Sequence, residues 1–154
     1  MKISIMHRNA GILALVMISI FFSSTVVVET LGTDNQIARV KTSILYAIPV
    51  LIGAMMIAGA TGFRMADGNP KGLASKKFMR MKIAAALGIV VLAPAAYVLE
   101  GLATQGNYGN RFMLIQGLEL IAGAVNLTLI SLNARDGMRM KRNWSQANSN
   151  ATAS

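Results

Sequence analysis

Four apolar stretches, each bounded by polar residues, organise the chain. They cover about residues 9–29, 42–63, 83–103 and 112–132. The hydrocarbon core of a bilayer is roughly 30 Å thick and a helix rises about 1.5 Å per residue, so about 20 apolar residues can cross it. Each stretch meets this requirement. We therefore expect four transmembrane helices within a single domain of residues 1–142.

The connections between the spans predict how the helices pack. Residues 29–41 join the first span to the second, and residues 100–110 join the third to the fourth; both contain turn-forming residues. Short connections place sequence neighbours side by side and in opposite directions. The pattern thus predicts an all-α integral membrane protein, a four-helix antiparallel bundle.

The remaining segments are polar. Residues 64–82 include a turn signal at 67–70. Within this segment, Ser75–Lys82 could form a short basic amphipathic helix at the lipid headgroups, although its composition is more typical of a solvated loop. Residues 143–154 are small, polar and weakly charged, and we expect a disordered tail.

Basic residues are distributed unevenly among these segments. The chain has 15 Lys and Arg against 6 Asp and Glu; two of the basic residues precede the first span, six lie in residues 64–82 and four follow the last span. Only Arg39, Lys41 and Arg111 fall on the opposite side. Because retained positive charge orients membrane proteins, we expect an N-in/C-in topology with the middle loop in the cytoplasm. The basic excess suits anionic lipid, and no motif indicates nucleic acid.

The first span has a second interpretation, because Lys2 and Arg8 precede it as they would in a secretory signal. Its apolar run exceeds the usual signal core of about 7–15 residues and no Ala-x-Ala-like site follows, so we expect a retained helix. The chain contains no cysteine. A disulfide framework, a thiolate metal site and a cysteine nucleophile are therefore excluded.

The last span carries polar residues at helical spacing. One face of the predicted helix holds a polar stripe, which consists of Gln116, Glu119, Gly123, Asn126, Ile130 and Asn133. A carboxylate facing lipid at the bilayer centre costs on the order of 2.5–3.5 kcal/mol, so we expect Glu119 to face the bundle interior. Ser23 and Tyr97 lie at similar predicted depth. Glu29 and Glu100 lie where their helices leave the outer face, and we expect them to reach water.

The polar stripe supports two functional interpretations. In one, Glu119 titrates and Gln116 and Asn126 act as ligands in a site for a proton or a small polar solute, with Tyr97 and Ser23 as further members. In the other, these polar side chains hold the helices together, each hydrogen bond contributing about 0.6 kcal/mol on average.

Other candidate chemistry is sparse. His7 is the only histidine, so it is a candidate ligand, but it excludes a bis-histidine haem within one chain and a multi-histidine metal site. Eleven methionines favour packing over copper binding because the close pairs do not converge on one face. No phosphate loop, nucleophile elbow or dinucleotide fingerprint occurs, which argues against an enzyme. No pattern identifies a cofactor.

The segments "QGLELIAGAVNLTLISLNARDG" and "ATGFRMADG" resemble a pattern in small four-span bacterial inner-membrane proteins. The resemblance implies a multi-pass protein of the bacterial cytoplasmic (inner) membrane, and it carries over no site residue. We favour a non-catalytic subunit or assembly component of a larger membrane complex, which contacts the lipid bilayer and either copies of itself or other membrane subunits. The alternative is a proton-coupled carrier or channel for a small polar solute or ion that uses Glu119. A redox subunit binding haem or quinone near His7 is a weaker alternative.

Overall fold

The computed structural model describes residues 2–66, 68 and 72–153, and from residue 140 onward it describes the backbone only. Four long helices are present in the described part of the chain, each long and apolar enough to cross a membrane. Their bounds are α1 Lys2–Leu31, α2 Asp34–Met65, a third helix made of α3 Leu73–Leu87, η1 Gly88–Leu92 and α4 Ala93–Thr104, and α5 Asn110–Ala153. The predicted all-α four-helix fold is confirmed.

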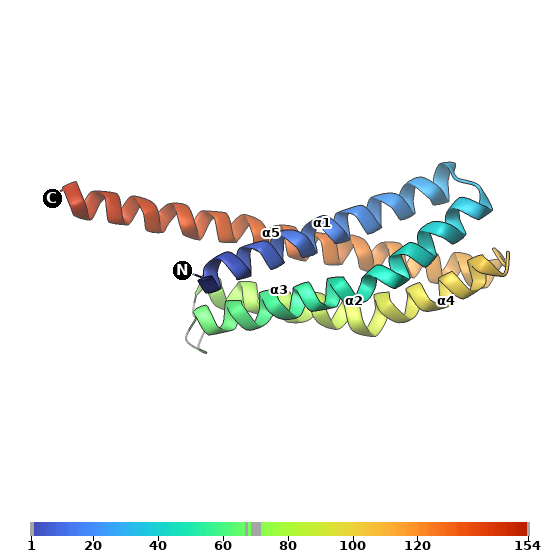
Figure 1. The fold of residues 1–154 in the computed structure, drawn as a ribbon, viewed down its shortest axis with the longest axis horizontal. Coiled ribbons are helices and arrows are strands. Elements are labelled where there is room, and N and C mark those ends of the chain that lie inside the picture. Colours follow the sequence, from blue (N-terminus) through green and yellow to red (C-terminus); the bar gives the residue numbers. More distant parts are fainter. Residues whose placement is uncertain (1, 67, 69–71, 154) are drawn as a thin grey trace.

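The four helices form a ring in which each packs against two neighbours. Helix α1 contacts α2 and α5, and the third helix contacts the same two, so α1 lies diagonal to the third helix and α2 lies diagonal to α5. Both ends of the chain lie at one end of the bundle together with the connection between α2 and α3 (Figure 1). The other two connections lie at the opposite end. Sequence neighbours are therefore antiparallel, as expected.

The connection between α1 and α2 is short because local hydrogen bonds end one helix and start the next. The Gly32 amide donates to the Val28 carbonyl at 2.9 Å, which satisfies an otherwise free carbonyl at the end of α1. The Thr33 amide donates to Gln36 Oε1 at 2.8 Å, one half of a capping box at the start of α2. These bonds fix the tight antiparallel turn.

The two prolines inside spans differ in their effect on the backbone ladder. Pro94 follows the π-helical segment η1, and the Ala93 amide bonds to the carbonyl of Gly88, five residues earlier. Since proline has no amide hydrogen, the wider π turn changes the hydrogen-bonding register where the ladder would otherwise be broken. Pro49 lies inside α2 without ending it.

Two polar segments are more helical than their composition predicts. Helix α3 begins at Leu73, so Ser75–Lys82 is part of a helix continuous with the third span rather than a loop or a separate interfacial helix. The backbone of α5 is helical to Ala153, where we expected a disordered tail from residue 143. No Gly or Pro follows Gly137 to end that helix. Most of the predicted turn at 67–70 lies outside the described residues.

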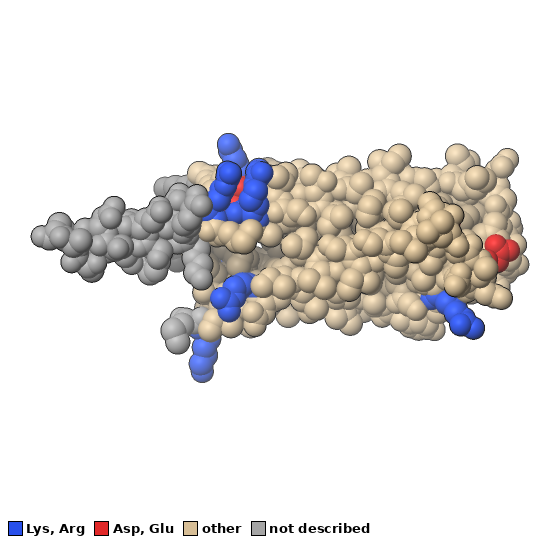
Figure 2. All heavy atoms as spheres, turned by 90° about the horizontal axis from the view of Figure 1, so that it is seen from above, with Lys and Arg blue, Asp and Glu red and all other residues tan. Residues whose placement is uncertain are grey.

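The helices bury small side chains and expose large apolar ones. Buried positions include Ala14, Ala58 and Ala96, whereas the exposed fractions of Val90 and Leu114 are 70% and 75%. A broad surface without charge separates the two ends of the bundle (Figure 2). A surface of this kind is favourable in hydrocarbon and unfavourable in water. The architecture is that of a small multi-pass membrane protein.

Candidate functional site

A buried lysine connects three helices near the end of the bundle opposite to the termini. Lys41 of α2 is only 1% exposed, and its Nζ donates to Glu119 Oε2 of α5 at 2.6 Å. The same Nζ lies 3.7 Å from Glu29 Oε1 of α1. Because α2 and α5 are diagonal in the ring, the Lys41 side chain crosses the bundle interior. We call Glu29, Lys41 and Glu119 the charged cluster.

The charged cluster corrects two expectations from the sequence. The sequence places Lys41 among the charges outside the bilayer and predicts that Glu29 reaches water, yet the side chains of Lys41 and Glu29 are only 1% and 16% exposed. The spacing of Ile37, Lys41 and Ile44 does place Lys41 on the same helical face as two apolar residues. All three side chains are buried in the structure. A charged residue at a predicted helix end normally reaches water, so the sequence alone does not indicate that Lys41 is buried. The structure makes Lys41 the partner that Glu119 requires.

The polar stripe of α5 faces the interior, as predicted. Gln116 and Asn126 are 6% and 1% exposed, and the Glu119 side chain is 12% exposed. Gln116 Nε2 donates to Glu119 Oε2 at 3.2 Å, and Asn133 Nδ2 donates to the backbone carbonyl of Lys77 at 3.1 Å. The stripe is thus bonded along α5 itself and across to α3.

Two predicted partners of Glu119 do not reach it. Tyr97 is 69% exposed, and Ser23 is also exposed. Successive helical residues differ by about 100° in direction, so a residue one or two positions from a buried one can point outward. On α1 the buried hydroxyl is that of Thr25. Tyr97 and Ser23 therefore lie outside the charged cluster, because equal depth along the helices does not fix the direction in which a side chain points.

Glu100 also differs from its expected place in water. Its side chain is partly buried, and its Oε1 accepts a hydrogen bond from the Thr42 hydroxyl at 3.1 Å. Thr42 follows Lys41 directly on α2. The end of the bundle opposite to the termini therefore contains a second polar link, between α2 and α4, beside the charged cluster.

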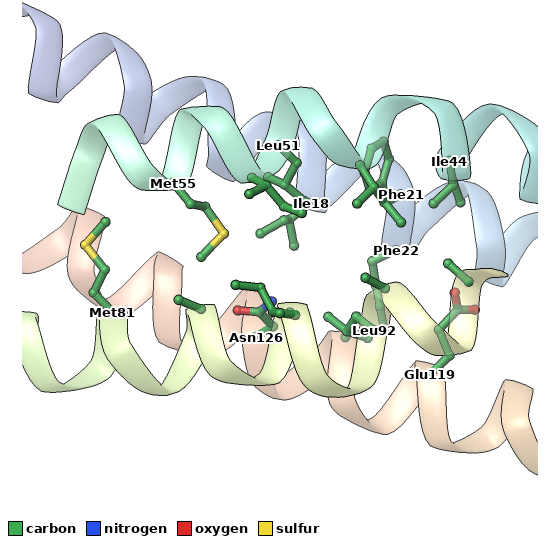
Figure 3. Close-up of a pocket in the computed structure, with 18 of the residues that line it drawn as sticks. Ile18, Phe21, Phe22, Ile44, Leu51, Met55, Met81, Leu92, Glu119 and Asn126 are labelled. Atoms are coloured by element: carbon green, nitrogen blue, oxygen red, sulfur yellow. The ribbon is translucent and has the colours of Figure 1, made fainter. Parts of the chain in front are cut away.

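A cavity of about 290 Å³, partly open to the surface beside the exposed Met56 and Ile89, extends inward from Glu119 and is lined by all four helices. Its lining is apolar for most of its length, with Phe21, Leu51 and Met55 among the side chains in Figure 3. Glu119 lines one end and Asn126 lies part of the way along. This volume is at the lower limit of typical small-molecule sites. The arrangement can therefore hold a small, mostly apolar ligand with a polar group.

His7 lies at the other end of the bundle and is part-buried. Its Nδ1 is 2.9 Å from the Ala58 carbonyl and 3.2 Å from the Thr61 hydroxyl. A carbonyl can only accept, so Nδ1 carries the hydrogen and joins α1 to α2. No group of three His, Cys, Asp or Glu side chains that could hold a metal occurs in the described part of the chain. This geometry assigns His7 a helix-joining contact and leaves its predicted ligand role as a prediction.

A second buried ion pair joins α3 to α5 at the same end as the termini. Asp136 is 3% exposed and accepts a hydrogen bond from Arg80 Nη1 at 2.6 Å. Sequence reasoning missed this pair because both residues were assigned to solvated segments. Its only signal in the sequence is position, because Asp136 follows Asn133, the last residue of the polar stripe, by a further step of three.

Comparison with known proteins adds no family: no protein-family model, curated protein or solved structure matches the chain.

Proposed function

We propose that this protein is a small proton-linked membrane carrier, in which the interior cavity binds a ligand and Glu119 binds the proton. The supporting observation is the position of Glu119, which both lines the cavity and belongs to the charged cluster. A ligand in the cavity meets the same carboxylate that pairs with Lys41. Ligand and proton then compete for one group, and such competition links the binding of one to the release of the other. The apolar lining favours an apolar or amphipathic ligand over the polar solute expected from sequence.

The composition of the charged cluster supports an exchangeable proton. It contains two carboxylates and one ammonium group, so full ionisation leaves one negative charge uncompensated. An unpaired charge in a low-dielectric interior is costly, and one proton on either carboxylate neutralises the cluster. Lys41 lies within 4 Å of both carboxylates, so it can stay paired with Glu29 when Glu119 is protonated. Glu100 of α4 is a further carboxylate at the same end of the bundle, where it accepts a hydrogen bond from Thr42, the residue after Lys41.

The distribution of basic residues supports an orientation as part of the proposal. Basic side chains gather at the end of the bundle from which the end of α5 emerges, and few lie at the other end (Figure 2). We place this basic end in the cytoplasm of a bacterial cell, with the chain in its inner membrane. The charged cluster then lies toward the outer leaflet. A ligand can enter the cavity from the surrounding lipid.

A second candidate function is a non-catalytic subunit or assembly component of a larger membrane complex. The observation that favours it is that Lys41 joins α1, α2 and α5, which is what a purely structural cluster would do. Polar links of this kind hold membrane bundles together without a transported ligand. Partners in this case are other membrane subunits or further copies of the chain.

Infrared difference spectroscopy separates the two candidates. The full chain is reconstituted in lipid, and the protonated-carboxyl band is followed across the pH range in which carboxylic acids titrate. The carrier proposal predicts a reversible band that Glu119→Gln removes while circular dichroism stays unchanged. Asp34→Asn, at an exposed position, should leave the band intact. Identical spectra for wild type and Glu119→Gln would contradict the proposal and favour the structural candidate.

A further inference from the structure

The buried atoms without partners share one chemical character. Four buried side-chain atoms have no hydrogen-bond partner among the described residues, and all four are oxygens, namely Glu29 Oε1, Gln116 Oε1, Asn126 Oδ1 and Asn133 Oδ1. Burying a polar atom without a partner costs about 1–3 kcal/mol. The interior therefore has unused acceptors, and a ligand that satisfies them has to supply donors.

The Gln116 amide supports this assignment. The oxygen and nitrogen of an amide can be exchanged by turning the group, so an unpaired oxygen need not mean a free acceptor. Gln116 uses its nitrogen to donate to the Glu119 carboxylate at 3.2 Å. A carboxylate can only accept, so the nitrogen must stay there and the oxygen is left as the free acceptor.

Glu119 itself has one oxygen that none of the described contacts uses. The hydrogen bonds from Lys41 and from Gln116 both end on Oε2. Glu119 lines the cavity, and Figure 3 shows its carboxylate at one end of that cavity. Oε1 can therefore accept from a ligand without displacing Lys41. Glu29 Oε1, which lies 3.7 Å from Lys41 Nζ without a hydrogen bond, and the free Gln116 Oε1 add to the negative potential at this end.

Asn126 provides a second polar group on the same path. It is 1% exposed, lines the cavity, and its Oδ1 has no partner among the described residues. Seven residues separate it from Glu119, which is about 10 Å along the helix. Thr25 and Lys82 also line the cavity, Lys82 at the end away from Glu119, and the other lining side chains are apolar. Lys82 is exposed, and its Nζ lies 4.7 Å from the centre of the Phe78 ring at that end of the cavity.

We propose that the cavity binds a protonated lipophilic amine, with its ammonium group at Glu119 and its hydrocarbon extending inward past Asn126. This inference rests on the proposed function and names its substrate class. An ammonium group supplies both N–H donors and positive charge, which match free acceptors beside a cluster with an excess carboxylate. An alcohol lacks the charge, a quaternary ammonium lacks the N–H donors, and a carboxylate is repelled. Binding of the amine displaces the proton from Glu119.

Isothermal titration calorimetry of the full chain in nanodiscs of zwitterionic lipid tests the proposal, with empty nanodiscs subtracted. Three probes share a ten-carbon chain: decylamine, decyltrimethylammonium and decanol. We expect saturable binding of decylamine, at least about tenfold tighter than that of the other two, which is about 1.4 kcal/mol. Glu119→Gln should abolish the preference for the amine, Asn126→Leu should weaken amine binding, and Asp34→Asn should change neither. Equal binding of the three probes would overturn the proposal.

The acidity of the medium provides a second readout. Decylamine affinity should rise with pH while the amine remains protonated, because the proton and the amine compete for Glu119. The groups that face Glu119 are Lys41 of α2, Glu29 of α1 and Gln116 of its own helix. Affinity independent of pH would overturn the proposal. If Glu119 titrates in the infrared experiment but decylamine does not bind, the substrate class is wrong and the proton-linked function stands. If Glu119 does not titrate, the proposed function itself fails.

Discussion

Lys41 Nζ lies 2.6 Å from Glu119 Oε2 inside the bundle, although the helices that carry them are diagonal neighbours. The contact spans the interior instead of a helix–helix interface. Few side chains other than Lys and Arg are long enough for this. The pair gives the Glu119 carboxylate a partner, and it also places a charge next to the cavity.

Replacement of Lys41 by Met should destabilise the bundle strongly. It leaves Glu29 and Glu119 in the interior without their cation, and breaking a buried ion pair from one side costs about 3–5 kcal/mol. Thermal unfolding in mild detergent, followed by circular dichroism, measures the loss. Arg39→Met, at an exposed position of the same helix, should change stability by less than about 0.5 kcal/mol. Equal effects of the two substitutions would contradict a buried role for Lys41.

The two interior amides of α5 should respond in opposite ways to replacement by Leu. Gln116 donates to a carboxylate, and losing a hydrogen bond to a charged group costs about 1.5–3 kcal/mol. Asn126 carries a buried oxygen without a described partner, so Asn126→Leu should be neutral or stabilising. Unfolding in detergent compares the two variants. A larger loss for Asn126→Leu than for Gln116→Leu would show that the hydrogen bonding is assigned incorrectly.

Arg80→Met should loosen the contact between α3 and α5. It leaves Asp136, which is 3% exposed, without its 2.6 Å partner. Hydrogen exchange measured by mass spectrometry should show faster exchange in the first turns of α3. Arg135 lies 3.8 Å from the same carboxylate and is 55% exposed, and exposed pairs contribute about 0–1 kcal/mol. Arg135→Met should therefore leave the exchange of α3 nearly unchanged, and the reverse order of effects would exclude the proposed pairing.

Tyr108 should make stability fall at alkaline pH. Its hydroxyl donates to the Asp34 carbonyl at 2.8 Å, and burial, followed by the charges of Asp34 and Glu29, raises the pKa of the phenol above its usual value of 10.0. A raised pKa means that the folded state holds the proton more tightly, so this contribution is complete below pH 10.0 and is lost as pH rises through the folded value. Unfolding of wild type and Tyr108→Phe across this range measures the contribution. A parallel pH dependence of both proteins would contradict it.

The sequence predicts the four spans from the lengths of its apolar stretches and the inward face of α5 from the spacing of its polar residues. Helix length in a bilayer is set by thickness, and steps of three and four place Gln116, Glu119 and Asn126 on one side whatever the neighbouring helices do. A single sequence therefore suffices to predict which residues share one face of a helix.

The partners across the bundle are not available in this way. Tyr97 was chosen by depth, and it is 69% exposed because its rotation about the helix axis depends on how the third helix packs. Lys41 and Asp136 looked like solvated charges at the ends of spans, and only tertiary packing buries them. The cavity is likewise a property of four helices together. Pairings that depend on the relative rotation of helices need the structure.

A double-mutant cycle between Lys41 and Glu119 tests the central claim most directly. The free energy of unfolding is measured in mild detergent for wild type, Lys41→Met, Glu119→Gln and the double variant. Residues in direct contact show interaction energies of about 0.5–3 kcal/mol, whereas distant residues are additive within about 0.5 kcal/mol. If Lys41 and Glu119 are paired, the loss of unfolding free energy in the double variant should be smaller than the sum of the losses in the two single variants by at least about 1 kcal/mol. Additive effects would contradict it.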